Sequence, residues 1–291
     1  MNKIAKSHIA LVIATIIFGL HYTIAKQAMP VPFRPLQLLF FRMLGSVILF
    51  WILQKFYAPE KVERKDMFTL AICGFFGFAA NQALFYIGLN LTTPVDASLI
   101  HVLNPILVMI FASIVLSEKI TRIRLGGVAL GASGALILVL YGKIIDLGST
   151  TTEGNIIVMV NMLFYAMYIV MVKPMVEKYH ITTVMKWISL YGFIVIIPFA
   201  FKPMTQFQLV QLNTSAWLTL FYVIVINTFI AYLLLNFALR HVDAGAVGYY
   251  TYIQPILASV TSVSLGTGTI TIPKVIAAVL IFGGVYMVNR K

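Results

Sequence analysis

Ten polar side chains stand inside long apolar runs of this sequence, where their neighbours are almost all hydrophobic. These candidate substrate-binding residues are His21, Asn81, Gln82, His101, Asn104, Tyr165, Tyr168, Asn227, Tyr250 and Gln254. Amides and phenols donate and accept hydrogen bonds, and imidazole also titrates near neutral pH, so such a set can bind a small polar molecule. A hydrogen bond to a neighbouring helix explains any one of them equally well. Because they fall in six separate apolar runs, together they favour a polar cavity.

Groups that could perform covalent or metal chemistry are scarce. No carboxylate lies near the middle of an apolar run, and His21 and His101 have no obvious third ligand. We therefore predict no catalytic residues and no metal site. The single cysteine, Cys73, can form no intrachain disulfide, and no cofactor is expected.

The elements that hold these side chains must be membrane-spanning helices. Of the 291 residues, 60% are hydrophobic and 10% are charged. The mean hydropathy of +0.95 exceeds what a soluble domain can cover with its own polar surface. A net charge of +12 would suggest nucleic-acid binding in a soluble protein, but here the basic residues fall between apolar runs. We predict an integral membrane protein that binds no nucleic acid.

About 20 apolar residues cross the hydrocarbon core as a helix. Runs of this length predict an all-α fold of ten transmembrane helices, at residues 6–28, 34–54, 67–89, 95–115, 121–141, 153–173, 183–201, 215–239, 244–264 and 272–289. Fourteen lysines and arginines then fall on one side of the membrane, and four on the other, namely Arg34, Lys143, Lys202 and Lys274. The positive-inside rule places both termini in the cytoplasm.

The second half of the chain repeats the first. Pro105 and Pro255 lie 150 positions apart, and each is preceded by an amide side chain and followed by Ile-Leu. Other matches fall at an offset of 147. The pattern predicts two five-helix domains, residues 1–147 and 148–291. Because five is odd, the second copy enters the membrane from the opposite side, which gives inverted repeats.

Several local patterns carry a family resemblance. They are Phe18-Gly19 with Lys26, Pro35 with Arg42, Ala83-Leu84 through Gly88-Leu89, Ala97-Ser98, Pro105, and Leu116-Ser117-Glu118 with Gly127 and Gly134. In order and spacing these resemble the EamA-type, ten-span members of the drug/metabolite transporter superfamily. The resemblance implies export of small metabolites or drugs through a central cavity. The chain departs from the family pattern at His21, where Asn is common, and at Thr267, where Glu is usual.

Five charged residues are candidates for gating or structural roles, namely Lys26, Arg42, Asp96, Lys173 and Asp243. Lys26 with Asp96 would close the outer side, and the second lysine and aspartate the inner side. Alternatively, the aspartates are helix caps and the lysines extend to the membrane surface. Arg42, about eight residues into its helix, needs a partner or water. It either pairs with backbone carbonyls or faces a substrate carboxylate.

Two further features concern helix shape and contact. Pro105 and Pro255 are predicted helix-break positions, because each removes a backbone N–H and frees a carbonyl. Small faces allow close contact between helices, and they are formed by Gly126, Gly127, Gly131, Gly134, Gly283 and Gly284. Such contact could join the two halves of one chain or build a homodimer.

Together these features predict a secondary transporter in the cytoplasmic (inner) membrane. We expect efflux of a small neutral or zwitterionic metabolite, such as an amino acid, by alternating access. The expected partners are this small-molecule substrate and the lipid bilayer. Uniport or exchange is the default, and any proton coupling should run through His21 and His101. An intramembrane enzyme and a structural or receptor-like membrane protein stay as alternatives.

Overall fold

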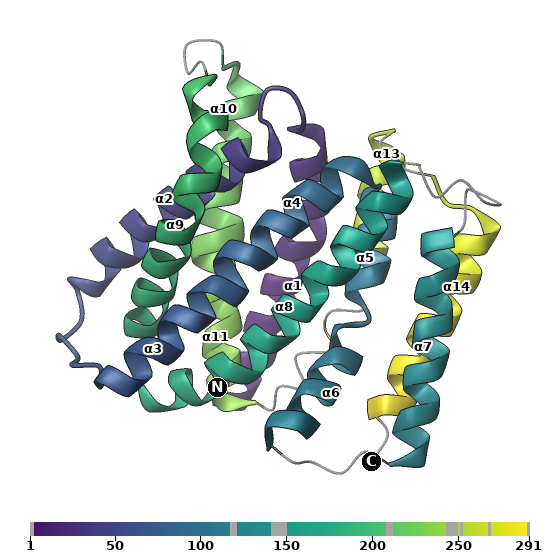
Figure 1. Ribbon diagram of the computed structural model, residues 1–291, viewed down its shortest axis with the longest axis horizontal. Coiled ribbons are helices and arrows are strands. Elements are labelled where there is room, and N and C mark those ends of the chain that lie inside the picture. Colours follow the sequence, from purple (N-terminus) through teal and green to yellow (C-terminus); the bar gives the residue numbers. More distant parts are fainter. Residues whose placement is uncertain are drawn as a thin grey trace.

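The computed structural model is built from helices and describes residues 3–116, 121–140, 150–207, 212–242, 250, 253–266 and 269–289 (Figure 1). No β-strand occurs in these ranges. The predicted all-α class is therefore confirmed. Most of the long helices run side by side across the molecule, which is the arrangement expected of a helical bundle (Figure 1).

The first half of the chain contributes eight helical elements. They are α1 (Lys3–Gln27), α2 (Pro35–Gln54), α3 (Arg64–Cys73), the π-helix η1 (Gly74–Ala80), α4 (Asn81–Leu91), α5 (Pro94–His101), α6 (Asn104–Leu116) and α7 (Arg122–Leu140). The start of α5 follows from its sequence. Pro94 occupies the first turn, where no N–H donor is needed. The side chain of Thr93 accepts a hydrogen bond from the N–H of Asp96 at 3.1 Å.

In the second half, the described elements follow the same order. They are α8 (Thr150–Lys178), α9 (Ile181–Thr205), α10 (Thr214–Phe221), the π-helix η3 (Tyr222–Ile230), α11 (Ala231–His241), α13 (Ile253–Ser264) and α14 (Ile272–Asn289). Both halves thus insert one π-helical stretch into a long helix. Such stretches are frequent at functional sites. An amide side chain accompanies each, because Asn81 follows η1 directly and Asn227 lies within η3.

Seven helical runs among the described residues are long and apolar enough to cross a membrane. They are Lys3–Gln27, Pro35–Gln54, Arg64–Leu91, Pro94–Phe111, Thr150–Lys178, Ile181–Thr205 and Thr214–His241. These coincide with seven of the ten predicted spans. The other three predicted spans contain the shorter apolar stretches Leu125–Gly134, Ile253–Ser264 and Ile272–Gly284, and they stay predictions.

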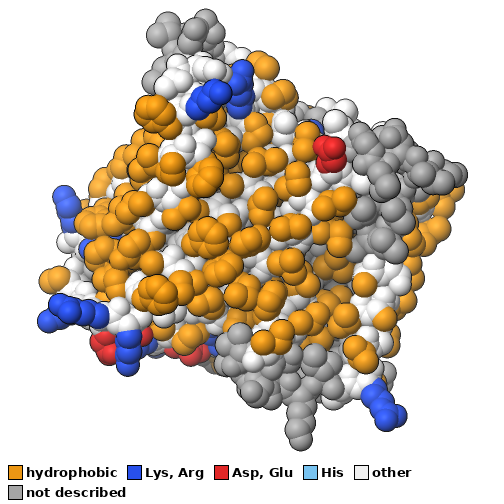
Figure 2. Space-filling model, in the orientation of Figure 1, with side chains coloured by type: hydrophobic (Ala, Val, Ile, Leu, Met, Phe, Trp, Pro, Cys, Tyr) orange, Lys and Arg blue, Asp and Glu red, His pale blue; other side chains and the backbone are white. Residues whose placement is uncertain are grey.

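The surface of the bundle is itself apolar. Hydrophobic side chains cover the middle of the face in Figure 2, and most charged side chains on it lie near its margins. Large side chains such as Phe68, Phe199 and Phe201 are each more than 60% exposed. A soluble monomer rarely exposes so much contiguous apolar surface, whereas a lipid-facing surface requires it.

The packing of the helices is related between the two halves. In the first half α1 packs against α11 and α13, and in the second half α8 packs against α4 and α6. Likewise α2 packs against η3 and α9 against η1, while α2 also contacts α9 directly. Exchanging each helix for its counterpart in the other half leaves this set of contacts unchanged. The central helices of each half are therefore held mainly by the other half.

Helices α7 and α14 form a closely packed pair beside the rest of the bundle (Figure 1). A Cβ atom on Gly284 would lie 2.5 Å from the carbonyl oxygen of Gly127, and one on Gly134 would lie 2.7 Å from that of Ala277. Only glycine permits such an approach of two backbones. The small faces thus join the two halves within one chain.

Candidate functional site

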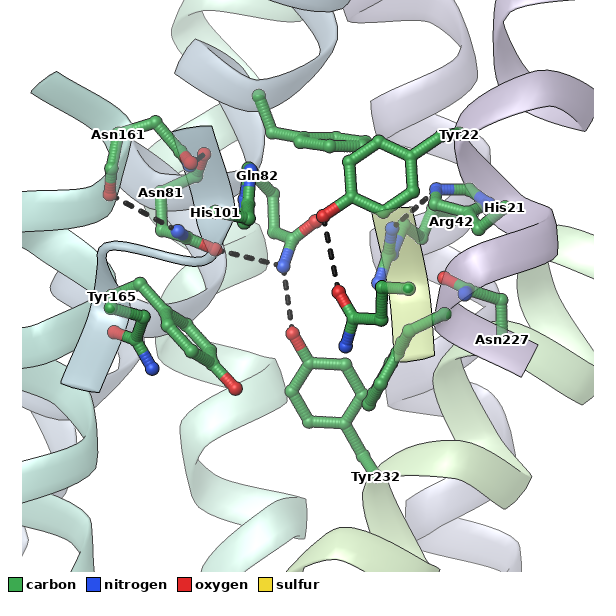
Figure 3. Close-up of a pocket in the computed structure, with 14 residues that line it drawn as sticks. His21, Tyr22, Arg42, Asn81, Gln82, His101, Asn161, Tyr165, Asn227 and Tyr232 are labelled. Carbon is green, nitrogen blue, oxygen red and sulfur yellow. Dashed lines mark hydrogen bonds between the residues drawn. The ribbon is translucent and has the colours of Figure 1, made fainter. Parts of the chain in front are cut away.

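A cavity lies between the helices of the two halves (Figure 3). Its lining residues are Phe18, His21, Tyr22, Arg42, Asn81, Gln82, Phe85, His101, Asn104, Asn161, Tyr165, Asn227, Tyr232 and Gln254. The space between these side chains amounts to about 580 Å³, a figure that includes the opening to solvent. Amides, imidazoles and aromatic rings dominate the lining, so the cavity offers hydrogen bonds and apolar contact together.

The structure brings eight of the ten candidate binding residues to this cavity. They are His21, Asn81, Gln82, His101, Asn104, Tyr165, Asn227 and Gln254. They come from both halves of the chain and from helices far apart in sequence. Their role in binding a substrate stays a prediction, but their meeting at one place satisfies the first requirement for it.

Two candidates lie elsewhere. The ring of Tyr168 is buried against Gly77 of η1, where a Cβ atom on the glycine would lie 2.2 Å from the ring. Tyr168 therefore fills a slot between α8 and η1 rather than lining the cavity. The hydroxyl of Tyr250 is 2.8 Å from Nδ1 of His8, near the start of α1, and it does not line the cavity either.

The aromatic part of the lining was missed by the search for polar residues. Phe18 lies three residues before His21 and four before Tyr22, and Phe85 lies three residues after Gln82. Residues three or four apart share one face of a helix. The sequence therefore contained a pattern that could have found these aromatic residues, because side chains on the same helix face as a cavity-lining polar residue line the same cavity.

Hydrogen bonds join the two halves across the cavity (Figure 3). Nε2 of Gln82 lies 2.7 Å from the hydroxyl oxygen of Tyr232, to which it donates. These two residues stand 150 positions apart, which is the offset of the repeated prolines. The hydroxyl of Tyr22 donates to Oε1 of Gln254 at 3.2 Å. Gln82 thus meets the residue at its corresponding position in the other half, Tyr232, at the cavity.

Arg42 is the strong base of the cavity, and it is only 2% exposed. Its Nη1 lies 3.0 Å from the hydroxyl of Tyr86 and 3.3 Å from Nε2 of His21, and its guanidinium carbon lies 5.7 Å from the Tyr86 ring centroid. Since arginine only donates, Nε2 of His21 is the acceptor. These partners are side chains, so the alternative in which Arg42 pairs with backbone carbonyls is not supported.

The predicted pair of Lys26 with Asp96 is not formed. Nζ of Lys26 donates to the carbonyl oxygens of Leu89 at 3.0 Å and Asn90 at 2.7 Å. A cation at this position caps the C-terminal end of α4 and opposes its dipole. Asp96 pairs instead with Lys274 of α14 at 3.0 Å. The reason is that the Thr93 cap fixes Asp96 in the first turn of α5, on the side of α14.

Lys173 occupies the corresponding place in the second half. Its Nζ is 3.4 Å from the carbonyl oxygen of Leu239 and 2.9 Å from Oε1 of Glu177. Lys26 and Lys173 are 147 positions apart, and their acceptors Leu89 and Leu239 are 150 apart. Each lysine therefore reaches the end of the corresponding helix, α4 or α11. The predicted partner Asp243 lies outside the described residues.

The position of Pro105 differs from a simple kink. The helix ends at His101, the chain makes a turn at Val102 and Leu103, and α6 starts at Asn104 with Pro105 as its second residue. Pro105 therefore stands in the first turn of a new helix, where its missing N–H costs nothing. Pro255 is the third residue of α13, and the two residues before α13 lie outside the described ranges.

An apolar-surfaced helical bundle whose two halves share a polar central cavity defines a membrane protein of the transporter type. The chain belongs to the EamA-like transporter family, whose model matches residues 5–140 and again residues 152–290. The family resemblance drawn from the sequence is thereby confirmed, and it points to a transporter rather than an enzyme.

Individual relatives agree with this assignment. The uncharacterised transporter YyaM of Bacillus subtilis is 28% identical over 221 residues, which are 75% of this chain and 70% of the relative. An uncharacterised transporter of Archaeoglobus fulgidus is 24% identical over 290 residues, or 99% of this chain and 98% of the relative. A crystal structure with 18% identity superposes with a TM-score of 0.65 over 98% of this chain and 97% of that chain, which supports the fold.

Proposed function

We propose that this protein is a secondary carrier that exports a small neutral or zwitterionic metabolite, such as an amino acid, across the cytoplasmic membrane. The observation that carries the proposal is the cavity lined from both halves, at which Gln82 meets its counterpart Tyr232. The lining offers many neutral hydrogen-bonding groups and aromatic rings, and it contains one strong base and no carboxylate. That composition suits a molecule with little or no net charge and an apolar portion.

Alternating access requires two halves that can exchange conformations about the site. Three observations support two inverted repeats, residues 1–147 and 148–291, each with five helices. The family model matches the chain twice. The helix contacts are preserved when the halves are exchanged. A π-helical stretch occurs at the corresponding place in each half. The uneven distribution of lysine and arginine supports a cytoplasmic location for both termini in this arrangement.

In this mechanism Lys26 closes the outer side through backbone carbonyls in place of Asp96, and Lys173 closes the inner side. Lys26, at the outer end of α1, makes two contacts of 3.0 Å or less with the end of α4. Lys173, at the inner end of α8, makes one longer contact with the end of α11. This difference supports a state in which the outer side is the more tightly closed. Opening the outer side would break the hydrogen bonds of Lys26 and shorten the contact between Lys173 and the carbonyl oxygen of Leu239.

The test is counterflow of labelled L-phenylalanine, L-leucine and L-threonine into proteoliposomes containing the full-length protein. We expect uptake by the native protein and a loss of at least tenfold in Gln82→Ala. The matched control is Gln206→Ala, because this amide bonds the exposed Arg34 outside the cavity. A protein that carries only multiply charged anions, such as nucleotide sugars, would overturn the proposal.

Coupling is tested in the same vesicles with an imposed pH gradient. We expect exchange without accumulation, or proton-driven accumulation that disappears when both His21 and His101 are replaced by glutamine. Strong accumulation that survives the double replacement would contradict this mechanism.

A further inference from the structure

No carboxylate among the described residues balances the charge of Arg42. Arginine stays protonated at all physiological pH values, so a buried guanidinium needs an anion or water. Across the described ranges, no carboxylate lies within 4.0 Å of it, since every ion pair found there involves a lysine. Its buried Nε also has no hydrogen-bond partner. Two tyrosine rings and one imidazole are its neighbours, and these stabilise a cation only weakly.

Further donors without partners lie at the same end of the cavity. In Figure 3, Arg42, His21 and Asn227 stand together on one side of the view. Nδ1 of His21 and both Nδ2 and Oδ1 of the Asn227 amide are buried and make no hydrogen bond among the described residues. Because Nε2 of His21 accepts from Arg42, its proton is on Nδ1, which makes Nδ1 a donor. This end of the cavity thus holds three donors, and one amide oxygen beside them, that have no hydrogen-bond partner among the described residues.

The opposite end presents acceptors. Asn161 lies on the far side of the view from Arg42 (Figure 3). Its side-chain oxygen is buried and makes no hydrogen bond of good geometry in the described part of the chain, although the His101 side chain interacts with this amide. The side-chain oxygen of Asn104, another residue of the lining, is buried without a hydrogen bond among the described residues. The side-chain nitrogen of Asn161 donates a hydrogen bond to the backbone oxygen of Asn81. The side-chain oxygen of Asn161 therefore points away from Asn81 and faces other groups. Aromatic rings of the lining, such as Phe85, complete the cavity between the two ends.

We propose that Arg42 binds the carboxylate of the substrate, and that the substrate is an amino acid zwitterion with an apolar or aromatic side chain. The inference rests on the proposed transport function and deepens it. The carboxylate lies against Arg42, His21 and Asn227. The ammonium group lies toward the amide oxygens of Asn104 and Asn161, and the rings hold the side chain. The substrate supplies the anion that no described residue offers to Arg42, so the cavity favours a molecule with one carboxylate.

This assignment explains an asymmetry between the two halves. The position that corresponds to Arg42 at the offset of 147 is Ser189, which is buried and bonds the backbone oxygen of Lys186 at 3.0 Å. The guanidinium therefore belongs to the first half alone, and it does not serve the shared packing of α2 and α9. A group present at one of two equivalent positions fits a ligand that has one charged end of each sign.

The experiment compares ligands that differ only at the carboxylate. The probes are L-phenylalanine, L-phenylalaninamide and phenethylamine at about pH 6, where the amino groups are protonated. Binding is measured by the thermal shift of the purified full-length protein, and transport by counterflow in proteoliposomes. The variants are Arg42→Gln and Arg42→Lys. Arg34→Gln is the matched control, since it removes an arginine from the exposed start of the same helix.

We expect the native protein and Arg34→Gln to bind L-phenylalanine at least tenfold more tightly than the amide or the amine. A charge-assisted hydrogen bond of about 1.5–3 kcal/mol corresponds to a loss of about 10- to 100-fold. Arg42→Gln should lose this preference and bind acid and amide alike, whereas Arg42→Lys should recover part of it. Gel filtration and the melting temperature without ligand report whether each variant is folded.

Two results would overturn the inference. If the native protein binds and carries the amide or the amine as well as the acid, Arg42 does not recognise a carboxylate, while the proposed transport function stands. The same conclusion follows if a folded Arg42→Gln keeps the preference for the acid. If the native protein carries none of these probes or other amino acids, this inference fails, and the proposed function fails with it only if multiply charged anions alone are carried. The native comparison is decisive even if Arg42→Gln does not fold.

Discussion

The ion pair between Asp96 and Lys274 gives a prediction with a defined magnitude. The side chains are 5% and 10% exposed, and the atoms Oδ1 and Nζ are 3.0 Å apart. Removing one partner of a buried pair leaves an uncompensated charge, which costs about 3–5 kcal/mol. Replacing both partners by neutral groups of similar size removes that charge, and the cost then falls to near zero. We therefore expect Lys274→Met to be strongly destabilised, and the double variant with Asp96→Asn to recover most of the loss.

Thermal unfolding of the purified protein in detergent is the assay. A loss of 3–5 kcal/mol corresponds to a fall of about 6–20 °C in melting temperature for a chain of this size. Lys65→Met is the matched control, because its partner Glu63 and its own side chain are 52% and 75% exposed. That control should melt as the native protein does. A Lys274→Met variant that also melts like the native protein, or a double variant no better than the single one, would refute the reasoning.

Three further predictions concern other contacts. Gly284→Ala should lower the melting temperature far more than Gly283→Ala. A Cβ at position 284 would lie 2.5 Å from a carbonyl oxygen, whereas the nearest atom to a Cβ at position 283 is 3.4 Å away. Equal melting temperatures of the two variants would contradict the close α7–α14 contact. Lys26→Met should slow counterflow at least tenfold, since it removes two charge-assisted hydrogen bonds of about 1.5–3 kcal/mol each. The control Lys186→Met should transport normally, because the native Nζ of Lys186 lies 4.2 Å from a tryptophan ring centroid. Normal flux in both variants would exclude a closing role for Lys26. Hydrogen bonds from two lysines hold the pKa of Glu63 below its ordinary value, so the contribution of Glu63 to stability is present above about pH 4.3 and is lost as pH falls through the folded pKa. Between about pH 6 and pH 3 the melting temperature of Glu63→Gln should therefore change less with pH than that of the native protein. The same change with pH in both proteins would contradict this prediction.

The helices could be located from the sequence because the bilayer imposes a local rule. A helix in lipid satisfies its own backbone hydrogen bonds and needs a continuous apolar run, so composition within one window is sufficient. Seven predicted spans coincide with long apolar helices. The π-helical stretches η1 and η3 were not predicted. They depend on contacts such as that of Gly192 with Phe78, where a Cβ on the glycine would lie 2.6 Å from the side chain.

Most of the cavity lining was also accessible to sequence reasoning. A polar side chain in an apolar run needs a partner in any fold, and this requirement selected residues such as His21 and Gln82 before their neighbours were known. The direction of a side chain required more. Tyr165 and Tyr168 are three residues apart on one helix, yet one lines the cavity and the other packs against Gly77. The space left by a glycine on another helix made that difference.

The partners of the charged groups were decided by tertiary structure alone. Lys26 contacts a carbonyl 63 positions away, and Asp96 pairs with Lys274 on the last helix. Which helices adjoin, and how each is rotated about its axis, depends on packing summed over the whole chain. The sequence by itself determined that these residues are charged, near helix ends and in need of a partner. Only the fold decided that Lys26 caps a helix and that Arg42 faces the cavity without a carboxylate among the described residues, because both depend on distances between segments remote in sequence.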